Sequence, residues 1–181
     1  LKKTYKEMDS FGFRLENIIF QDFVELYGLD HWDISMHAME CFTINCSSEF
    51  AIRQFILKDE EKSMKQMIHW AKSENEELRR LASEGCRSRL PWAISLPIFK
   101  KDPSKVLEVL ELLKDDESKY VQKSVANNIN DISKDNPEIV IDIVKRWKDY
   151  SKSRDWILKH GSRTLLKDSN EEILDLFGYK N

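Results

Sequence analysis

Three segments of the chain begin with the same order of residue types: an apolar residue, a variable one and a basic one. They are Leu78-Arg79-Arg80, Val121-Gln122-Lys123 and Ile157-Leu158-Lys159, and their first residues lie 43 and then 36 positions apart. Each segment opens a stretch whose apolar residues recur every three or four positions, which is the spacing of an α-helix. One kind of helix therefore recurs at roughly regular intervals along the chain.

Helix pairs that recur about every 40 residues are typical of HEAT and armadillo-like solenoids, in which one column of helices lines a concave face. The chain has only 5 Gly and 4 Pro in 181 residues, so few tight turns are available. No convincing strand pattern is present. We therefore predict an all-α fold, an α–α superhelix, in a single domain over residues 1–181 that lacks part of its first repeat.

The boundaries of the helices follow from periodicity and from start signals. Asp102-Pro103 and Asn136-Pro137 each place a capping residue before proline, and Ser47-Ser48-Glu49 offers a further cap. The uncharged stretch Leu90–Phe99 is interpreted as a buried connection. The expected helices span residues 12–28, 33–45, 48–57, 61–73, 77–88, 103–114, 119–134, 137–149, 154–167 and 170–177.

The recurring helices have an apolar face and a polar one. Positions four apart share a face of a helix, and two such columns are expected on the concave side: Arg80, Lys123 and Lys159, then Glu84, Asn127 and Arg163. The opposite faces are expected to stack: Leu78, Leu81 and Gly85; Val121, Val125, Ile129 and Ile132; Ile157, Gly161 and Leu165. The net charge of −3 hides an asymmetry, since residues 79–101 and 119–167 each carry +5. We therefore predict a cationic concave face.

The helix that begins near Tyr120 contains an unusual number of polar residues. Asn127, Asn128 and Asn130 stand beside Asp131, although Asn is a poor helix former. Two interpretations are open: these side chains satisfy buried backbone groups at a loop junction, or they form a hydrogen-bonding surface for a polar ligand.

Arginines gather just before this helix. Arg80, Glu84 and Arg87 have the spacing of a solvated salt-bridge ladder. With Arg89 and Trp92 close behind, a phosphate clamp with an aromatic contact is the alternative. Three other tryptophans are predicted to fill the core: Trp70, Trp147 and Trp156.

The remaining chemistry-bearing residues point to no cofactor. Cys41, Cys46 and Cys86 are odd in number and lack the spacing of metal ligands, and the four histidines are scattered. These features favour a reducing cytoplasm and give no sign of a metal site. No apolar stretch near the chain ends is long enough to span a membrane, and no secretory signal is visible.

In these segments the sequence resembles the HEAT-like DNA alkylation repair glycosylases, and their AlkC-type branch in particular. The matching blocks lie in order over about residues 20–178: Ser47–Arg53, Leu78–Gly85, Arg87–Ala93, Ser124–Asp135, and His160 with Arg163-Thr164-Leu165. The sequence departs from the family pattern at Gln54 and Ser88, where proline is usual, and at Gln122-Lys123, which replaces a basic pair.

The resemblance implies a glycosylase that removes N3-methylated and similar alkylated bases from duplex DNA without a metal or cofactor. It implies that Glu49 and Glu84 are the active-site carboxylates. Other residues are expected to bind the substrate and its phosphates: Arg80, Arg87, Arg89, Trp92, Lys123, Asn127, Asp131, Lys159 and Arg163. A monomer in the bacterial cytoplasm, associated with the nucleoid when bound to DNA, is expected.

Two other classes remain open from the sequence. A HEAT-like protein that binds DNA without turnover has the same repeats and cations, and a protein-interaction scaffold has the same repeats. In either case Glu49 is a charge at a helix N-terminus and Glu84 is a salt-bridge partner.

Overall fold

The computed structural model describes residues 18–179, and within this range every regular element is helical. The all-α prediction is therefore confirmed. The helices are α2 (Ile18–Tyr27), α3 (Trp32–Thr43), α4 (Ala51–Lys58), α5 (Glu60–Ala71), α6 (Glu76–Gly85), α7 (Pro97–Lys101), α8 (Ser104–Leu113), α9 (Lys119–Ile132), α10 (Pro137–Trp147), α11 (Lys152–Gly161), α12 (Arg163–Lys167) and α13 (Glu171–Leu176).

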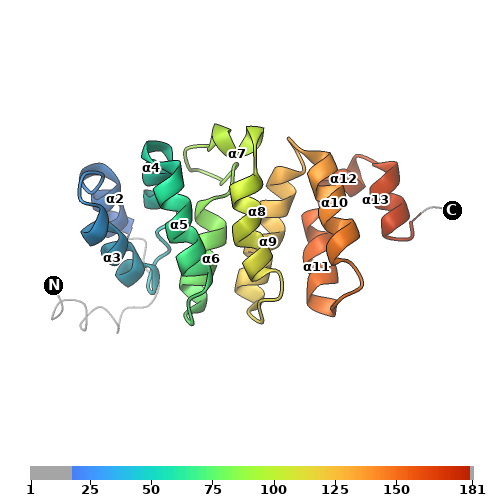
Figure 1. Ribbon diagram of the computed structural model, residues 1–181, viewed down its shortest axis with the longest axis horizontal. Helices are drawn as coiled ribbons and strands as arrows, with labels where there is room; N and C mark the ends of the chain where they lie inside the picture. Colours follow the sequence, from blue (N-terminus) through green and yellow to red (C-terminus); the bar gives the residue numbers. More distant parts are fainter. Residues whose placement is uncertain (1–17, 180–181) are drawn as a thin grey trace.

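The helices stack side by side from one end of the molecule to the other (Figure 1). In that view α5, α8 and α10 lie in front of α6, α9 and α11. Helix α9 packs against both α6 and α11, so the three recurring helices form one continuous column. The α–α superhelix predicted from the repeat spacing is thus the architecture of the described residues.

The predicted stacking faces are the core of this column. Val121, Val125 and Ile129 of α9 are fully buried, as are Leu81 of α6 and Ile157 of α11. Because these side chains come from consecutive repeats, each repeat buries its apolar face only against its neighbours. The spacing of apolar residues is therefore enough to explain which face of each recurring helix turns inward.

Two glycines allow the column to pack closely. A Cβ atom on Gly161 of α11 would lie 2.8 Å from Cγ2 of Ile129 on α9, and one on Gly85 of α6 would lie 2.7 Å from Cγ2 of Ile52 on α4. Both distances are shorter than van der Waals contact, so the helices approach each other through the missing side chains.

Several predicted boundaries were wrong in detail. The helix expected over 154–167 is two helices, α11 and α12, separated at Ser162. The connection over Leu90–Phe99 was expected to be buried, but Pro91, Trp92 and Ile94 are exposed. The stretch ends in the short helix α7, whose first residue, Pro97, is a helix-start signal. Residues 12–17 of the first expected helix lie outside the described residues, as does the expected shortening of the first repeat.

The expected caps act in different ways. Asp102 accepts a hydrogen bond from the backbone N–H of Ser104 at 2.9 Å, and α8 begins at Ser104. Asn136 precedes Pro137 as expected, but its amide donates to the carbonyl of Lys100 at 2.9 Å. Helix α4 begins at Ala51, beyond the predicted cap.

The tryptophans expected in the core divide into two groups. Trp70 and Trp147 are buried, as predicted. The prediction was wrong for Trp156, which is 41% exposed and stacks on the ring of His160 at 5.1 Å between centroids. Position 156 precedes the buried Ile157 on α11, so it lies toward the edge of the apolar face.

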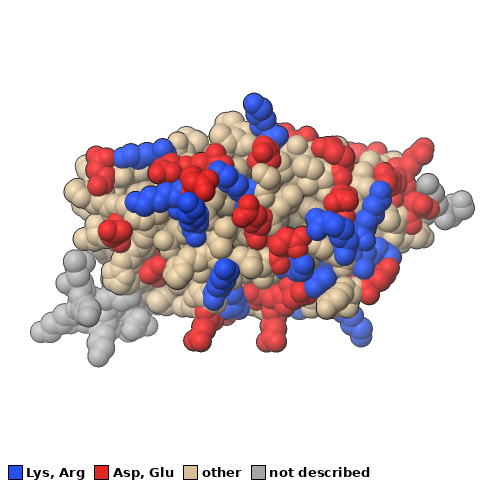
Figure 2. All heavy atoms as spheres, viewed as in Figure 1, with Lys and Arg blue, Asp and Glu red and all other residues tan. Residues whose placement is uncertain are grey.

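Acidic and basic side chains are interspersed over the face shown in Figure 2, with no continuous cationic area. This is the side on which α5, α8 and α10 lie in Figure 1. Among the described residues, no helix combines the length and apolarity that crossing a membrane requires.

Replacement of Gly161 by alanine tests the close approach of α9 and α11. The new methyl group would meet Ile129 and the carbonyl of Ala126, so we expect a loss of about 1–3 kcal/mol in the free energy of unfolding. Urea denaturation measures the change. Lys152→Ala, at an exposed position of the same helix, is the control and is expected to change the free energy by less than about 0.5 kcal/mol. Equal stability of Gly161→Ala and the wild type would show that the two helices are not in tight contact.

Candidate active site

A pocket of about 730 Å³ opens among the end of α3, the loop of residues 44–50, α6, the loop that follows α6 and the start of α9. Five of the predicted site residues line it: Glu49, Arg80, Glu84, Arg87 and Trp92. The other six predicted residues do not line this pocket: Arg89, Lys123, Asn127, Asp131, Lys159 and Arg163. The structure therefore brings together the two predicted catalytic carboxylates and separates them from most of the predicted phosphate contacts.

Arg80 joins Glu49 and Glu84, two of the three carboxylates that line the pocket. Its guanidinium donates a hydrogen bond to Glu49, which lies just before α4, and its Nη2 lies 3.5 Å from Oε1 of Glu84, one turn further along α6. The side chains of Arg80 and Glu49 are only 14% and 15% exposed. Since a partly buried ion pair is screened less than a surface one, Arg80 holds both carboxylates in defined positions.

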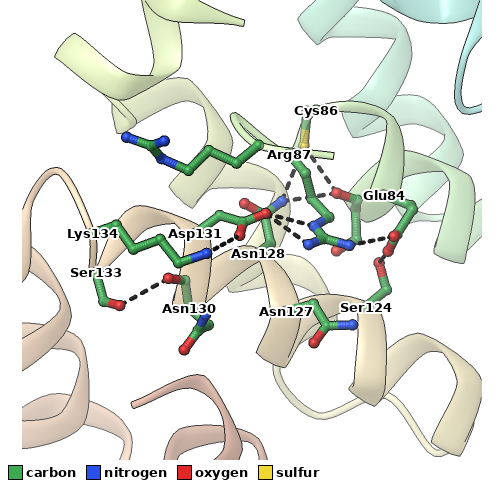
Figure 3. A network of polar contacts seen from close by, with 12 residues as sticks. Glu84, Cys86, Arg87, Ser124, Asn127, Asn128, Asn130, Asp131, Ser133 and Lys134 are labelled. Carbon is green, nitrogen blue, oxygen red and sulfur yellow. Dashed lines mark hydrogen bonds and ion pairs between the residues drawn. The ribbon is translucent and has the colours of Figure 1, made fainter. Parts of the chain in front are cut away.

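Arg87 connects Glu84 to Asp131 of α9 (Figure 3). Its Nη1 donates to Oε1 of Glu84 at 2.6 Å, and its Nε donates to Oδ2 of Asp131 at 2.8 Å. Burial alone lowers the pKa of Arg87, but the two carboxylates outweigh burial, so its pKa lies above the ordinary value. The side chain of Asp131 is only 2% exposed, and its Oδ1 also accepts a hydrogen bond from Nζ of Lys134 at 3.2 Å. Asp131 is therefore a buried support behind the pocket.

The polar stripe of α9 mostly satisfies groups of the protein itself. Ser124 donates to Oε2 of Glu84 at 2.5 Å, and Asn128 donates to the carbonyl of Ser83 at 2.8 Å (Figure 3). Asn130 accepts hydrogen bonds from the backbone and hydroxyl of Thr164. Of the two interpretations, satisfaction of buried groups describes Asn128 and Asn130, while Ser124 fixes a carboxylate of the pocket.

Arg89 does not point into the pocket. Its guanidinium makes two hydrogen bonds to the carboxylate of Asp135, at 2.9 and 2.5 Å, after α9. Together with Arg80 and Arg87, it shows that the arginine cluster is paired with acids distant in the sequence. The predicted ladder of Arg80, Glu84 and Arg87 is therefore present but not solvated, because all three side chains are buried or nearly so.

Trp92 stands at the edge of the pocket with its side chain fully exposed. Its backbone φ of 62° lies in the left-handed region, which is uncommon for a bulky residue. The loop of residues 86–96, between α6 and α7, holds this conformation. An exposed indole beside two carboxylates offers a flat π surface to a planar ligand, above all to a cationic one.

Three of the predicted phosphate contacts, on α9, α11 and α12, form no ion pair with an acid of the described residues. Lys123 and Lys159 are exposed. The guanidinium of Arg163 donates to the side-chain oxygen of Asn127 at 3.1 Å and to the carbonyl of His160 at 2.8 Å. The predicted cationic face is thus carried by this C-terminal part of the column, because the arginines of α6 and the following loop are neutralised.

Sequence reasoning missed several residues of the pocket wall, among them Glu77 of α6 and Tyr120 of α9. Tyr120, in the first turn of α9, lines the pocket, and the guanidinium of Arg80 lies 4.9 Å from the centre of its ring. A signal was present in the sequence, since Tyr120 precedes Ser124 by one helical turn and Ser124 bonds to Glu84.

This arrangement can stabilise a positive charge that develops next to the carboxylates of Glu49 and Glu84. Cys41, Cys46 and Cys86 are free thiols. Among residues 18–179, no three His, Cys, Asp or Glu side chains are grouped as metal ligands.

A family profile and a solved structure point to the same family. The profile of the family described as DNA alkylation repair enzyme matches residues 40–165. The chain is 52% identical over 167 residues to the uncharacterized protein YhaZ of Bacillus subtilis (strain 168), and the match covers 92% of this chain and 47% of YhaZ.

Two solved structures are similar. The alkylpurine DNA glycosylase AlkC of Pseudomonas fluorescens, solved with DNA containing an abasic site analog, superimposes with a TM-score of 0.86 at 42% identity, over 89% of this chain and 45% of AlkC. The smu.31 protein of Streptococcus mutans UA159 matches less well, with a TM-score of 0.54 at 31% identity, over 81% of this chain and 65% of smu.31. The chain thus spans about half the length of YhaZ and of AlkC.

The bridge made by Arg87 predicts a large effect on stability. Arg87→Met leaves Glu84 and Asp131 without their shared partner in a buried site, so we expect a loss of about 3–5 kcal/mol in the free energy of unfolding. Arg89→Met removes a more exposed pair and is expected to lose at most about 1 kcal/mol. Urea denaturation of the two variants measures the difference. Similar losses in both would mean that Arg87 is no more important to the fold than a surface ion pair.

Proposed function

The chain belongs to the DNA alkylation repair enzymes, in their AlkC-type branch, and on this premise we propose that it hydrolyses the N-glycosidic bond of N3-alkylated bases in duplex DNA. The observation that carries the proposal is the pair of carboxylates, Glu49 and Glu84, fixed by Arg80 in one pocket. AlkC, the glycosylase with the same fold, was solved on DNA with an abasic site analog, which represents the product of such a reaction.

The proposed reaction matches the charges in the pocket. A base alkylated at N3 already carries a positive charge, so the electron pair of the breaking C1′–N bond neutralises it and the base leaves without a general acid. The positive charge then moves to the sugar, which becomes an oxocarbenium ion. Glu49 and Glu84 supply negative charge beside C1′ and can orient the attacking water, which loses its proton and leaves a hydroxyl on C1′.

Trp92 supports recognition of the alkylated base. Its exposed indole can meet a cationic base face to face, whereas a neutral base gains less from the same contact. The preference for alkylated bases then rests on charge as well as on shape.

The DNA backbone is proposed to run over Lys123, Lys159 and Arg163. These cations lie on α9, α11 and α12, and α9 also contributes Tyr120 to the pocket. Phosphates bound there position the duplex without reading its sequence. Because this substrate is chromosomal DNA, the proposed activity belongs in the bacterial cytoplasm.

A DNA-binding protein without turnover is the second candidate. The observation that favours it is that Glu49 and Glu84 both already contact arginine, which reduces the negative potential available to an oxocarbenium ion. Excision of the base distinguishes the two candidates, since both bind DNA.

The variant Glu84→Gln tests the proposed chemistry. It keeps the shape of the side chain but removes the negative charge, so we expect the single-turnover excision rate to fall about 100-fold or more while the affinity for DNA stays near that of the wild type. Free 3-methyladenine released from a methylated duplex measures the rate.

Glu108→Gln is the matched control, because it removes one negative charge from an exposed position on α8. It is expected to excise at the wild-type rate. Wild-type excision by Glu84→Gln would refute the role of Glu84. Normal binding by the wild type with no release of base above background would favour the non-catalytic candidate.

The salt dependence of binding tests the proposed path of the DNA. The double variant Lys123→Ala/Lys159→Ala removes two exposed cations, so the slope of log K against log salt should decrease in magnitude by about 2. Lys65→Ala, on α5 in the other layer of helices, should leave the slope unchanged. A slope that Lys65→Ala changes as much as the double variant does would place the phosphates on the other layer.

A further inference from the structure

One arginine is enclosed completely beneath the pocket. Arg53, on α4, has no exposed surface. Burial lowers the pKa of its guanidinium to about 10, so Arg53 remains a cation at neutral pH. Among the described residues, no carboxylate forms an ion pair with Arg53. Every other described arginine except Arg163 is paired with an acid. A buried cation without a carboxylate is unfavourable unless other groups compensate it.

The compensation comes from three backbone carbonyl groups. The Nη1 of Arg53 donates to the carbonyls of Gly85 at 3.0 Å and of Arg87 at 2.8 Å, and its Nε donates to the carbonyl of Ile94 at 2.6 Å. Gly85 is the last residue of α6, where the carbonyl groups carry partial negative charge. The guanidinium therefore ties the beginning of the loop of residues 86–96 to its end.

That loop carries much of the candidate active site. Arg87 bridges Glu84 and Asp131, and Trp92 stands at the edge of the pocket with a backbone φ of 62°. A left-handed conformation at a tryptophan persists only when its surroundings impose it. The loop has two backbone hydrogen bonds across Trp92, from the N–H of Ala93 to the carbonyl of Leu90 at 3.3 Å and from the N–H of Leu96 to the carbonyl of Ser88 at 3.2 Å. The three bonds to Arg53 come from a separate helix and hold both ends of the loop.

We infer that Arg53 is a positioning residue of the excision site, which sets the path of the loop of residues 86–96 and thereby the places of Arg87 and Trp92. Arg53 does not line the pocket, so it acts only through the residues it holds. The planar fork of the guanidinium reaches three carbonyls at once, which the single nitrogen of a lysine cannot do. This inference rests on the proposed function, since it is the excision reaction that requires the loop in place.

Two variants and one control test the inference. Arg53→Met removes the charge and all three hydrogen bonds, and Arg53→Lys keeps the charge with a single donor nitrogen. Val109→Ala shortens a fully buried side chain on α8, outside the loop of residues 86–96, and so weakens the core. All proteins are compared at a temperature at which each is folded. The readouts are single-turnover release of 3-methyladenine, affinity for duplex DNA, and amide hydrogen exchange of residues 86–96.

For Arg53→Met we expect an excision rate about 100-fold below the wild type, because displacement of Arg87 and Trp92 slows the chemical step. The affinity for DNA should change far less. The exchange of residues 86–96 becomes faster while that of α8 and α9 is unchanged. Arg53→Lys should lie between the wild type and Arg53→Met. Val109→Ala should excise at the wild-type rate with wild-type exchange in the loop. If Arg53 only stabilised the fold, the two variants would instead affect excision and loop exchange alike.

The outcomes separate the inference from the function on which it rests. Wild-type excision and loop exchange in Arg53→Met would overturn the inference. If Arg53→Met does not fold, Arg53→Lys decides the question, and the same two results in Arg53→Lys would overturn it. If the wild type itself releases no base, the proposed function fails. Hydrogen exchange then still tests the loop, and equal exchange in wild type and variants would overturn the anchoring role as well.

Discussion

The bridge from Glu84 through Arg87 to Asp131 is the interaction on which the candidate site depends. Glu49, Glu84 and Asp131 have buried or nearly buried side chains. They cannot stay together without counter-charges, because each unpaired buried carboxylate is unfavourable by several kcal/mol. Arg80 and Arg87 supply those charges, and Arg87 does so across two repeats, from the end of α6 to α9. The same contacts therefore hold neighbouring repeats together and fix the carboxylates that face the pocket.

This pairing changes the interpretation of charge along the chain. The segment of residues 79–101 carries +5, and its arginines were expected to clamp phosphates. In the structure Arg80, Arg87 and Arg89 are each paired with an acid. Among the predicted phosphate contacts, those without an acidic partner in the described residues are Lys123, Lys159 and Arg163, so the proposed DNA path follows the C-terminal half of the column. The arginines instead keep the pocket from accumulating a negative charge too large for the fold to hold.

The spacing of residues along the sequence predicted the column of helices. It could not predict the contacts between residues that are distant in the sequence. The apolar spacing of α6, α9 and α11 identified their buried faces, since the period of a helix decides which side chains point inward. Arg87 bonds to Glu84, three positions before it, and to Asp131, 44 positions after it, and nothing in the spacing of either segment predicts the second partner. The same holds for Arg53, whose three partners are backbone carbonyls 32 to 41 residues further along. Helix α7 was missed although Pro97 signals its start, because the uncharged residues before it resembled a buried connection.

The account makes one geometric claim above all, that a damaged nucleotide binds with its sugar against the carboxylates of this pocket. A crystal structure of the protein with duplex DNA that contains an abasic-site analog tests it most directly. The account predicts C1′ within about 3–4 Å of a carboxylate oxygen of Glu49 or Glu84. It also predicts that Arg87 still bridges Glu84 and Asp131, and that phosphates lie near Lys123 and Lys159. DNA bound on the layer of α5, α8 and α10, or a sugar distant from both carboxylates, would contradict it.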